Sequence, residues 1–245
     1  MEATAWIDVV GAADLPPDRL ERVVHLGQVT TDEVGEAERE GPQAYLVAQG
    51  SATDELPVHF HTVEQFQYFA HGRGVVGTHE VAHGTVHYSD PLTPYGPLRP
   101  GREGMSYLTL RGVHDGGVRY MPAARDELRD LLGRSVRPPA ERRNVSIDLT
   151  GPVVGGGWHH LADEPDGLRV SVAELPSGER ADPLRVEAGG AYVVVVAGST
   201  SDDDGALGPP AMRWLPPGEV LEVRAGTLGA RVAALQFPGA PRAAG

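Results

Sequence analysis

The chain has 245 residues, a formal net charge of −13 at pH 7 and no cysteine. Without cysteine it has no disulfide, iron–sulfur cluster or thiolate zinc site, so a metal would need histidine, carboxylate or amide ligands. An acidic chain without a basic cluster is poorly suited to bind nucleic acid or an anionic membrane. No apolar run approaches the roughly 20 residues that span a bilayer, and the first residues do not resemble a signal peptide, so we expect a cytoplasmic protein.

The expected elements are almost all strands. The 32 glycines and 21 prolines are spread between short apolar runs, and this punctuation favours turns over long helices. Leu15–Val24, near the start, is expected to form a short helix. The strand-length runs rich in aromatic or β-branched residues then follow in two series, the first at Ala44–Ala48, Val58–His61, Gln65–Ala70, Gly84–Tyr88 and Met105–Arg111.

A helix separates the two series. Pro122 and Gly133 mark its start and end, and Leu128, Leu131 and Leu132 share one of its faces. The proline-containing stretch 134–143 is typical of a connector. The second series of expected strands lies at Leu168–Ala173, Ala191–Val196, Ala211–Leu215, Val220–Val223 and Ala230–Phe237.

Many short strands at fairly even spacing predict an all-β fold of the sandwich or barrel class. We therefore expect two β modules, residues 1–121 and 146–245, joined by a helical linker at 122–145.

Histidines gather in the first module. The chain has ten histidines, and six of them fall between His59 and His87. His59 and His61 are separated by one residue, so on a strand both point to the same face and two imidazoles can reach one ion. By itself such a pair is more often a surface or hydrogen-bonded pair than a metal site.

The residues after this pair carry a family resemblance. The segment His59-x-His61-x3-Gln65-x6-Gly72 resembles the first motif of the cupin superfamily, which is H-x-H, three or four residues, Glu, six residues and Gly. The resemblance implies a jelly-roll barrel whose interior holds one divalent metal through these histidines, the acidic residue and a histidine of a second motif. The second strand series then resembles a degenerate second barrel, which would make the chain a bicupin.

The chain departs from this pattern at two ligand positions. Gln65 replaces the glutamate, and its neutral amide can still coordinate through the carbonyl oxygen without contributing charge. The segment after Gly84 lacks the histidine of the second motif, and Tyr95 or its neighbours stand there instead. His87 is the nearest substitute.

Three alternatives follow for this site. The first is a metal held by His59, His61, Gln65 and His87, with Fe(II) favoured and Mn(II), Ni(II) or Zn(II) as alternatives. The second uses only the two paired histidines with Tyr95 or a water-bridged partner. The third is a barrel without metal, in which the histidines line a polar pocket.

Arg111 is a separate candidate. Tyr107, Thr109 and Arg111 alternate along one expected strand, so they share a face. If that face looks inward, Arg111 can bind a substrate carboxylate with two N–H groups. If it looks outward, the arginine closes an ion pair on the surface.

Taken with the resemblance, these residues favour a metal-dependent enzyme acting on a small organic molecule, first of all an Fe(II) dioxygenase. Its pocket would be lined by Phe66, Tyr68 and Tyr88, with Tyr95 and Arg111 acting on the substrate. A metal-dependent isomerase or lyase, and a non-catalytic bicupin that binds a small ligand or has a structural role, are the alternatives. Expected partners are a small-molecule substrate and a second copy of the chain, but neither nucleic acid nor a membrane.

Overall fold

The computed structural model describes residues 2–9, 12–14, 20–27, 41–52, 55–133, 141–153, 155–187, 189–202 and 205–239. The chain divides into two compact units. The N-terminal unit comprises residues 11–147, and the C-terminal unit comprises residues 148–245 together with residues 1–10. Within the described ranges, no helix has both the length and the apolar character needed to cross a bilayer.

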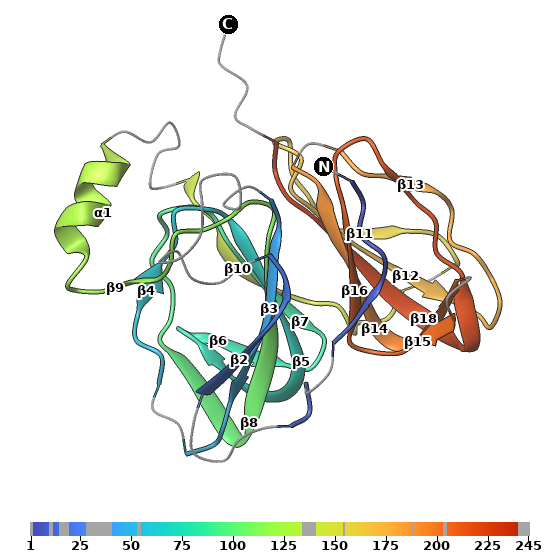
Figure 1. Cartoon of the computed structure of the whole chain (residues 1–245), viewed down its shortest axis with the longest axis horizontal. Coiled ribbons are helices and arrows are strands. Elements are labelled where there is room, and N and C mark those ends of the chain that lie inside the picture. The colour runs from blue at the N-terminus through green and yellow to red at the C-terminus, as the bar shows by residue number, and fades with distance from the viewer. Residues whose placement is uncertain are drawn as a thin grey trace, which may run out of the picture. The chain divides into compact units, whose positions relative to one another are not determined.

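In its described part, the N-terminal unit is built from strands and the helix α1 (Figure 1). A large sheet has the order β10-β7-β5-β8-β3-β2, with β6 paired to β5, and a two-stranded sheet joins β4 to β9. Its elements are β2 (Leu20–Leu26), β3 (Gln43–Gln49), β4 (His59–Phe60), β5 (Gln65–Val76), β6 (His79–Ala82), β7 (Thr85–Ser89), β8 (Leu98–Arg111), β9 (Arg119–Tyr120), α1 (Arg125–Leu132) and β10 (Asn144–Asp148).

The C-terminal unit repeats this plan. Its large sheet has the order β1-β16-β14-β18-β12-β11, with β15 paired to β14, and its small sheet joins β13 to β17. Its strands are β1 (Ile7–Asp8), β11 (His159–Asp163), β12 (Arg169–Leu175), β13 (Leu184–Arg185), β14 (Ala191–Asp202), β15 (Gly205–Leu207), β16 (Ala211–Leu215), β17 (Val220–Leu221) and β18 (Ala225–Gln236).

The all-β prediction and the two jelly-roll modules are confirmed, but the units differ from the expected modules at their ends. Strand β1 pairs with β16, so the first residues of the chain belong to the C-terminal unit. Strand β10 lies beside β7, so the stretch expected to be a linker contributes the helix and an edge strand to the N-terminal unit. The connector residues 134–140 lie outside the described ranges.

One expected helix is wrong and the other is confirmed. Residues 20–24 of the predicted Leu15–Val24 helix belong to β2, which pairs antiparallel with β3, while residues 15–19 lie outside the described residues. Pairing along the sheet edge has overridden the local helical pattern. The predicted helix after Pro122 is α1, and its apolar face packs through Leu128 against Phe60 and Leu92.

The interior of the N-terminal unit changes from polar to apolar along three neighbouring strands. Antiparallel register places Gln43 of β3 opposite Arg111 of β8, whose guanidinium donates to Gln65 at the start of β5. Side chains alternate along each strand, so every second residue of β5, β8 and β3 lies on the same face. Two further rows of cross-strand neighbours therefore share this face. These rows are Gln67, Thr109 and Tyr45, and then Phe69, Tyr107 and Val47. The third row belongs to a buried apolar cluster, so the hydrogen-bonding groups gather at one end of the barrel.

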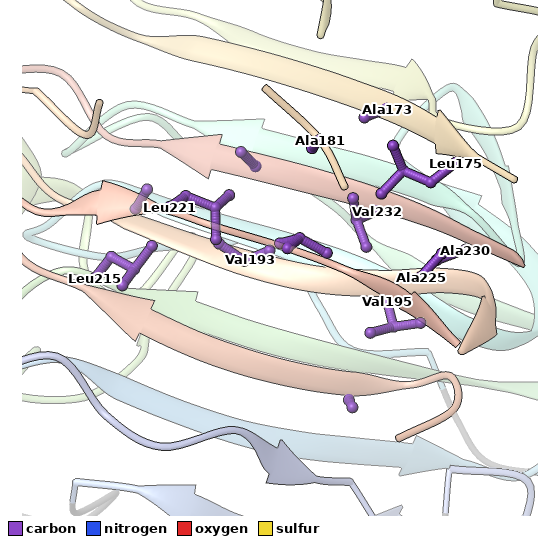
Figure 2. Close-up of a cluster of buried hydrophobic side chains, with 14 of the residues drawn as sticks. Ala173, Leu175, Ala181, Val193, Val195, Leu215, Leu221, Ala225, Ala230 and Val232 are labelled. Atoms are coloured by element: carbon purple, nitrogen blue, oxygen red, sulfur yellow. The ribbon is translucent and has the colours of Figure 1, made fainter. Parts of the chain in front are cut away.

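The interior of the C-terminal unit is apolar where the first unit is polar. Counted from the bend glycines Gly72 and Gly198, the positions of Gln65 and Gln67 are taken by Ala191 and Val193. Figure 2 shows the resulting cluster of alanine, valine and leucine side chains. Gln236 stands at the position of Arg111, and none of the buried residues described in this unit is charged. The expectation of a degenerate second barrel agrees with this packing.

Candidate ligand site in the N-terminal unit

A pocket of about 250 Å³ opens at the polar end of the N-terminal barrel. This is slightly below the range of roughly 300–1,000 Å³ that is typical of pockets for drug-sized ligands, so a small molecule fits it. Among the described residues that line it, two are arginines and none is acidic. The polar and aromatic lining residues are Arg22, Tyr45, His59, His61, Gln65, Gln67, Tyr95, Thr109, Arg111 and Tyr120.

Three of the four predicted metal ligands line this pocket. His59 lies on β4 and His61 just after it, and their rings are 5.4 Å apart between centroids. Gln65 begins β5 and faces the same pocket. The fourth, His87, is not among the lining residues. Its Nδ1 atom is 2.8 Å from the Ser146 hydroxyl of β10, at the edge of the sheet.

The hydrogen bonds of His59 define its tautomer. Its Nδ1 lies 2.7 Å from the Pro57 carbonyl oxygen, which can only accept, so Nδ1 carries the proton. The Tyr95 hydroxyl therefore donates to the unprotonated Nε2, at 2.8 Å. These two residues meet because their backbones pair in an isolated antiparallel bridge. Burial lowers the pKa of His59 and raises that of Tyr95, so both side chains are neutral at pH 7.

His61 is held in the same tautomer by a carboxylate. Its Nδ1 donates to Asp115 Oδ2 at 2.7 Å, which leaves Nε2 unprotonated. Burial, together with the nearby positive charge of Arg111, lowers the pKa of His61 to about 4, so this ring too is neutral at pH 7.

Asp115 is the residue that the sequence did not reveal. Its carboxylate also accepts hydrogen bonds from the backbone and hydroxyl of Thr62 and from the Gly117 backbone. Burial alone would raise its pKa, but the His61 N–H and the Arg111 charge hold the pKa of the carboxyl far below its usual range. It lies four residues after Arg111 in a glycine-rich loop, where the only local signal was a turn.

Arg111 lies in the middle of these groups. Its face of β8 looks toward the pocket, as the inward alternative required. Its Nε and Nη2 groups donate to Gln65 Oε1 at 3.1 and 2.9 Å, and Nη1 donates to Gln43 Oε1 at 3.2 Å. Nη2 also lies 3.2 Å from Nε2 of His61, and Nη1 lies 3.8 Å from the Asp115 carboxylate. The guanidinium is therefore held by side chains of the pocket wall.

The expected aromatic lining of the pocket needs correction. Phe66, Tyr68 and Tyr88 are absent from the described lining residues, and alternation along β5 and β7 puts them on the face opposite Gln65 and Gln67. The aromatic walls are instead Tyr45, Tyr95 and Tyr120.

The donor set fits a divalent metal only in part. Both histidines donate through Nδ1 to a fixed acceptor and keep Nε2 unprotonated, which is the arrangement of metal-binding histidines. However, Gln65 Oε1 already accepts two N–H groups of Arg111. In the described part of the chain, no three histidine or carboxylate side chains lie close enough together to hold an ion.

Charge weighs further against a metal. An ion bound to His61 Nε2 at about 2.1 Å would lie within about 5 Å of the Arg111 guanidinium. Two unit charges 5 Å apart repel by about 3 kcal/mol at an effective dielectric constant of 20, and a dication roughly doubles this. The residues present therefore do not fit the predicted four-ligand metal site.

A larger hollow of about 790 Å³ lies on the C-terminal unit. No histidine is among its described lining residues, and one of its walls, Leu228, is 82% exposed. Because binding sites combine enclosure with converging polar groups, the smaller pocket of the N-terminal unit is the better candidate.

No protein-family model matches the chain, and no curated protein sequence matches it. Solved structures do match, over nearly its whole length. A cupin 2 conserved barrel domain protein from Leptotrichia buccalis is 13% identical with a TM-score of 0.53, over 97% of this chain and 98% of that one. The nickel(II) complex of the bacterial pirin YhhW from Escherichia coli is 10% identical with a TM-score of 0.54, over 96% and 99%.

An 11S globulin from Wrightia tinctoria, whose structure is described as revealing an auxin binding site, is 11% identical with a TM-score of 0.61, over 97% of this chain and 84% of that one. At such identities the likeness concerns the fold and not the activity. The chain has the cupin fold, in the two-barrel form of a bicupin.

Proposed function

We propose that the N-terminal barrel binds a small organic anion in its polar pocket without the help of a metal. The observation that supports this proposal most is the positive charge of the pocket lining. Arg22 and Arg111 both line the pocket, and none of the described lining residues is acidic. The Asp115 carboxylate lies behind His61 and is not part of that lining. Arg22 stands on β2, is exposed and is the arginine better placed to meet an incoming carboxylate.

A second polar group favours a ligand that also carries a hydroxyl. Gln67 is 3% exposed, and its Oε1 atom has no hydrogen-bond partner within the described structure. A buried carbonyl without a donor costs about 1–3 kcal/mol, and a ligand O–H would recover this energy. An ammonium group would also donate, but the two arginines repel it. The pocket therefore suits a small hydroxylated acid.

Thermal denaturation with matched ligands tests this proposal. The probes are acetate, lactate, benzoate and salicylate, each compared with its primary amide. We expect at least one acid, best a hydroxylated one, to raise Tm while its amide does not, since a ligand at 100 times Kd adds about 2.7 kcal/mol of stability. Arg22→Gln should remove most of that shift, and Arg99→Gln, which alters an exposed arginine outside the pocket lining, should not. Equal shifts with acids and amides would contradict an anion site.

A metal-dependent enzyme of the oxygenase class is the second candidate. It is favoured by the unprotonated Nε2 atoms of His59 and His61 and by the likeness to a nickel-bound pirin. Metal analysis of protein purified without a histidine tag, before and after anaerobic Fe(II) addition, tests it. Less than about a tenth of an equivalent in both samples would rule against this candidate.

A further inference from the structure

The guanidinium of Arg111 engages the pocket atoms that the sequence assigns to a metal. Gln65 Oε1, the expected oxygen ligand, receives both Nε–H and Nη2–H of Arg111. The His61 ring, an expected nitrogen ligand, has the same Nη2 atom at 3.1 Å from Nδ1 and 3.2 Å from Nε2. One cation thus contacts two of the expected ligands.

This cation also sets the direction of a chain of hydrogen bonds. Arginine can only donate, so Gln65 must turn its carbonyl oxygen to Arg111 and its amide nitrogen to the Tyr95 oxygen. Tyr95 then donates to His59 Nε2, and His59 Nδ1 donates to the Pro57 carbonyl. The chain begins at a permanent cation and ends at a pure acceptor, so its direction cannot reverse.

The chain leaves His59 without a lone pair for a metal. Its Nε2 accepts the Tyr95 proton, and the Tyr95 oxygen is held in place as the acceptor of the Gln65 amide. Asp115 balances the charge of Arg111 from behind the pocket wall at 3.8 Å. The cluster is thus complete in charge and hydrogen bonds with an arginine at its centre.

We propose that Arg111 is the resident cation of this barrel and takes the place of a divalent metal. It holds the ligand-type side chains with N–H groups, and its charge disfavours a metal ion beside Gln65 and His61. This inference is independent of the organic ligand proposed above. It implies that a neutral side chain at position 111 turns the pocket into a metal site.

Nickel titration of chelator-treated, tag-free protein tests the inference. Isothermal titration calorimetry with NiCl2 compares the wild type with Arg111→Met and Arg111→Gln. We expect the wild type to show no saturable nickel binding with a Kd below about 1 mM, the weak end of the affinity scale. The two variants should bind one nickel per chain at least about ten times more tightly. Adding His59→Ala should abolish the gain, and Arg22→Met should produce none.

Several results would overturn the inference. One is stoichiometric nickel binding by the wild type that is lost in His59→Ala. Another is a variant at position 111 that keeps the far-ultraviolet circular dichroism spectrum of the wild type but gains no nickel affinity.

Gln65→Glu keeps the test decisive if both variants at position 111 fail to fold. It restores the carboxylate of the family motif and leaves Arg111 in place to pair with it. The inference predicts a folded protein that still binds no nickel. Tight nickel binding by this variant would show that the missing carboxylate, and not the guanidinium, excludes the metal. Thermal denaturation with the organic acids and their amides tests the organic-anion proposal separately, because it is carried out without metal.

Discussion

At the scale of single residues, Asp115 organises the candidate site without lining it. Its two oxygens accept from His61, from the Thr62 backbone and hydroxyl and from the Gly117 backbone, and its side chain is fully buried. It thereby fixes the ring of His61, the loop at the pocket mouth and the charge balance of Arg111.

Asp115→Asn is expected to lower the free energy of unfolding by about 3–5 kcal/mol, because it leaves the buried Arg111 without its counter-charge. The side-chain amide of the new asparagine also places its own N–H groups next to N–H donors such as that of His61. Urea denaturation followed by far-ultraviolet circular dichroism measures the change. Asp126→Asn, at an exposed ion pair with Arg129, is the matched control and should leave stability unchanged. Equal effects of the two substitutions would contradict the assigned role of Asp115.

The sequence predicted part of this site. His59, His61 and Gln65 were found because their spacing lies within one local motif, and alternation put Arg111 on a face that does look inward. His87 was chosen as the nearest substitute for the missing histidine; its ring lies 5.8 Å from that of Tyr95 between centroids, but its Nδ1 contacts Ser146 and it is not among the described lining residues. Asp115 was missed because a loop that folds back leaves no periodic signal in the sequence.

At the scale of elements, both barrels bend their longest strands with the same device. Gly72 in β5 and Gly198 in β14 have φ values of +70° and +72°, beside irregularities of register with β8 and β18. A Cβ atom at either position would collide with the backbone carbonyl of Gly104 or Gly229 on the neighbouring strand. Only glycine satisfies both constraints.

Gly72→Ala and Gly198→Ala should each cost about 2 kcal/mol or more, from the positive φ and the collision together. Hydrogen exchange with mass spectrometry locates the effect. We expect faster exchange in β5 and β8 for the first variant and in β14 and β18 for the second. Gly155→Ala, at a positive φ but with open space around the new Cβ, is the control and should perturb neither sheet. Uniform protection in all three variants would contradict the packing described.

A second element-scale feature ties the end of β7 to the start of β10. Asp90 accepts from the Arg143 backbone and guanidinium and from the Tyr88 hydroxyl, at 2.7–3.0 Å. Burial alone would raise the pKa of Asp90, but these hydrogen bonds hold it below its usual value.

This pKa predicts a pH dependence of stability. Because the folded state lowers the pKa, the unfolded state binds more protons in acid, so the Asp90 contribution is present above about pH 4 and is lost as the pH falls below it. At pH 7, Asp90→Asn should lower the free energy of unfolding by about 2 kcal/mol. Denaturation at pH 7 and pH 3 should show the difference from wild type shrinking in acid. A difference that grows in acid would contradict the assignment.

The elements themselves were largely predictable from sequence. Strands such as β5, β8 and β14 carry long apolar or aromatic runs, and α1 has a clear apolar face. Strand β2 was mistaken for a helix. Its conformation depends on pairing with β3 at the edge of the sheet, and this contact leaves no signal in the local sequence pattern.

At the scale of the whole molecule, two sheets of the same strand order carry different interiors. The N-terminal unit keeps a polar pocket, and the C-terminal unit fills the matching positions with alanine and valine. The C-terminal sheet gains its edge strand β1 from the other end of the chain, whereas the N-terminal sheet is edged by β10, at the end of its own contiguous segment. Such short edge strands have no sequence signature, so the expected module boundaries placed neither strand in its sheet.

Deletion of residues 2–9 tests the assignment of β1. Two residues of this segment pair with β16 in the sheet, and two further backbone hydrogen bonds join Thr4 to Trp214 and Val9 to Pro210. The deletion removes all of these contacts. We expect faster amide exchange along β16 and unchanged exchange along β7, its counterpart in the N-terminal unit. Faster exchange at β7 with a protected β16 would place the segment in the other unit.

An anomalous difference map at the nickel edge, from crystals grown with Ni²⁺, tests the assignment of the pocket cation most directly. We expect electron density for the Arg111 guanidinium against Gln65 and the His61 ring, and no anomalous peak in the pocket. A peak bound by the Nε2 atoms of His59 and His61, with the arginine displaced, would contradict it.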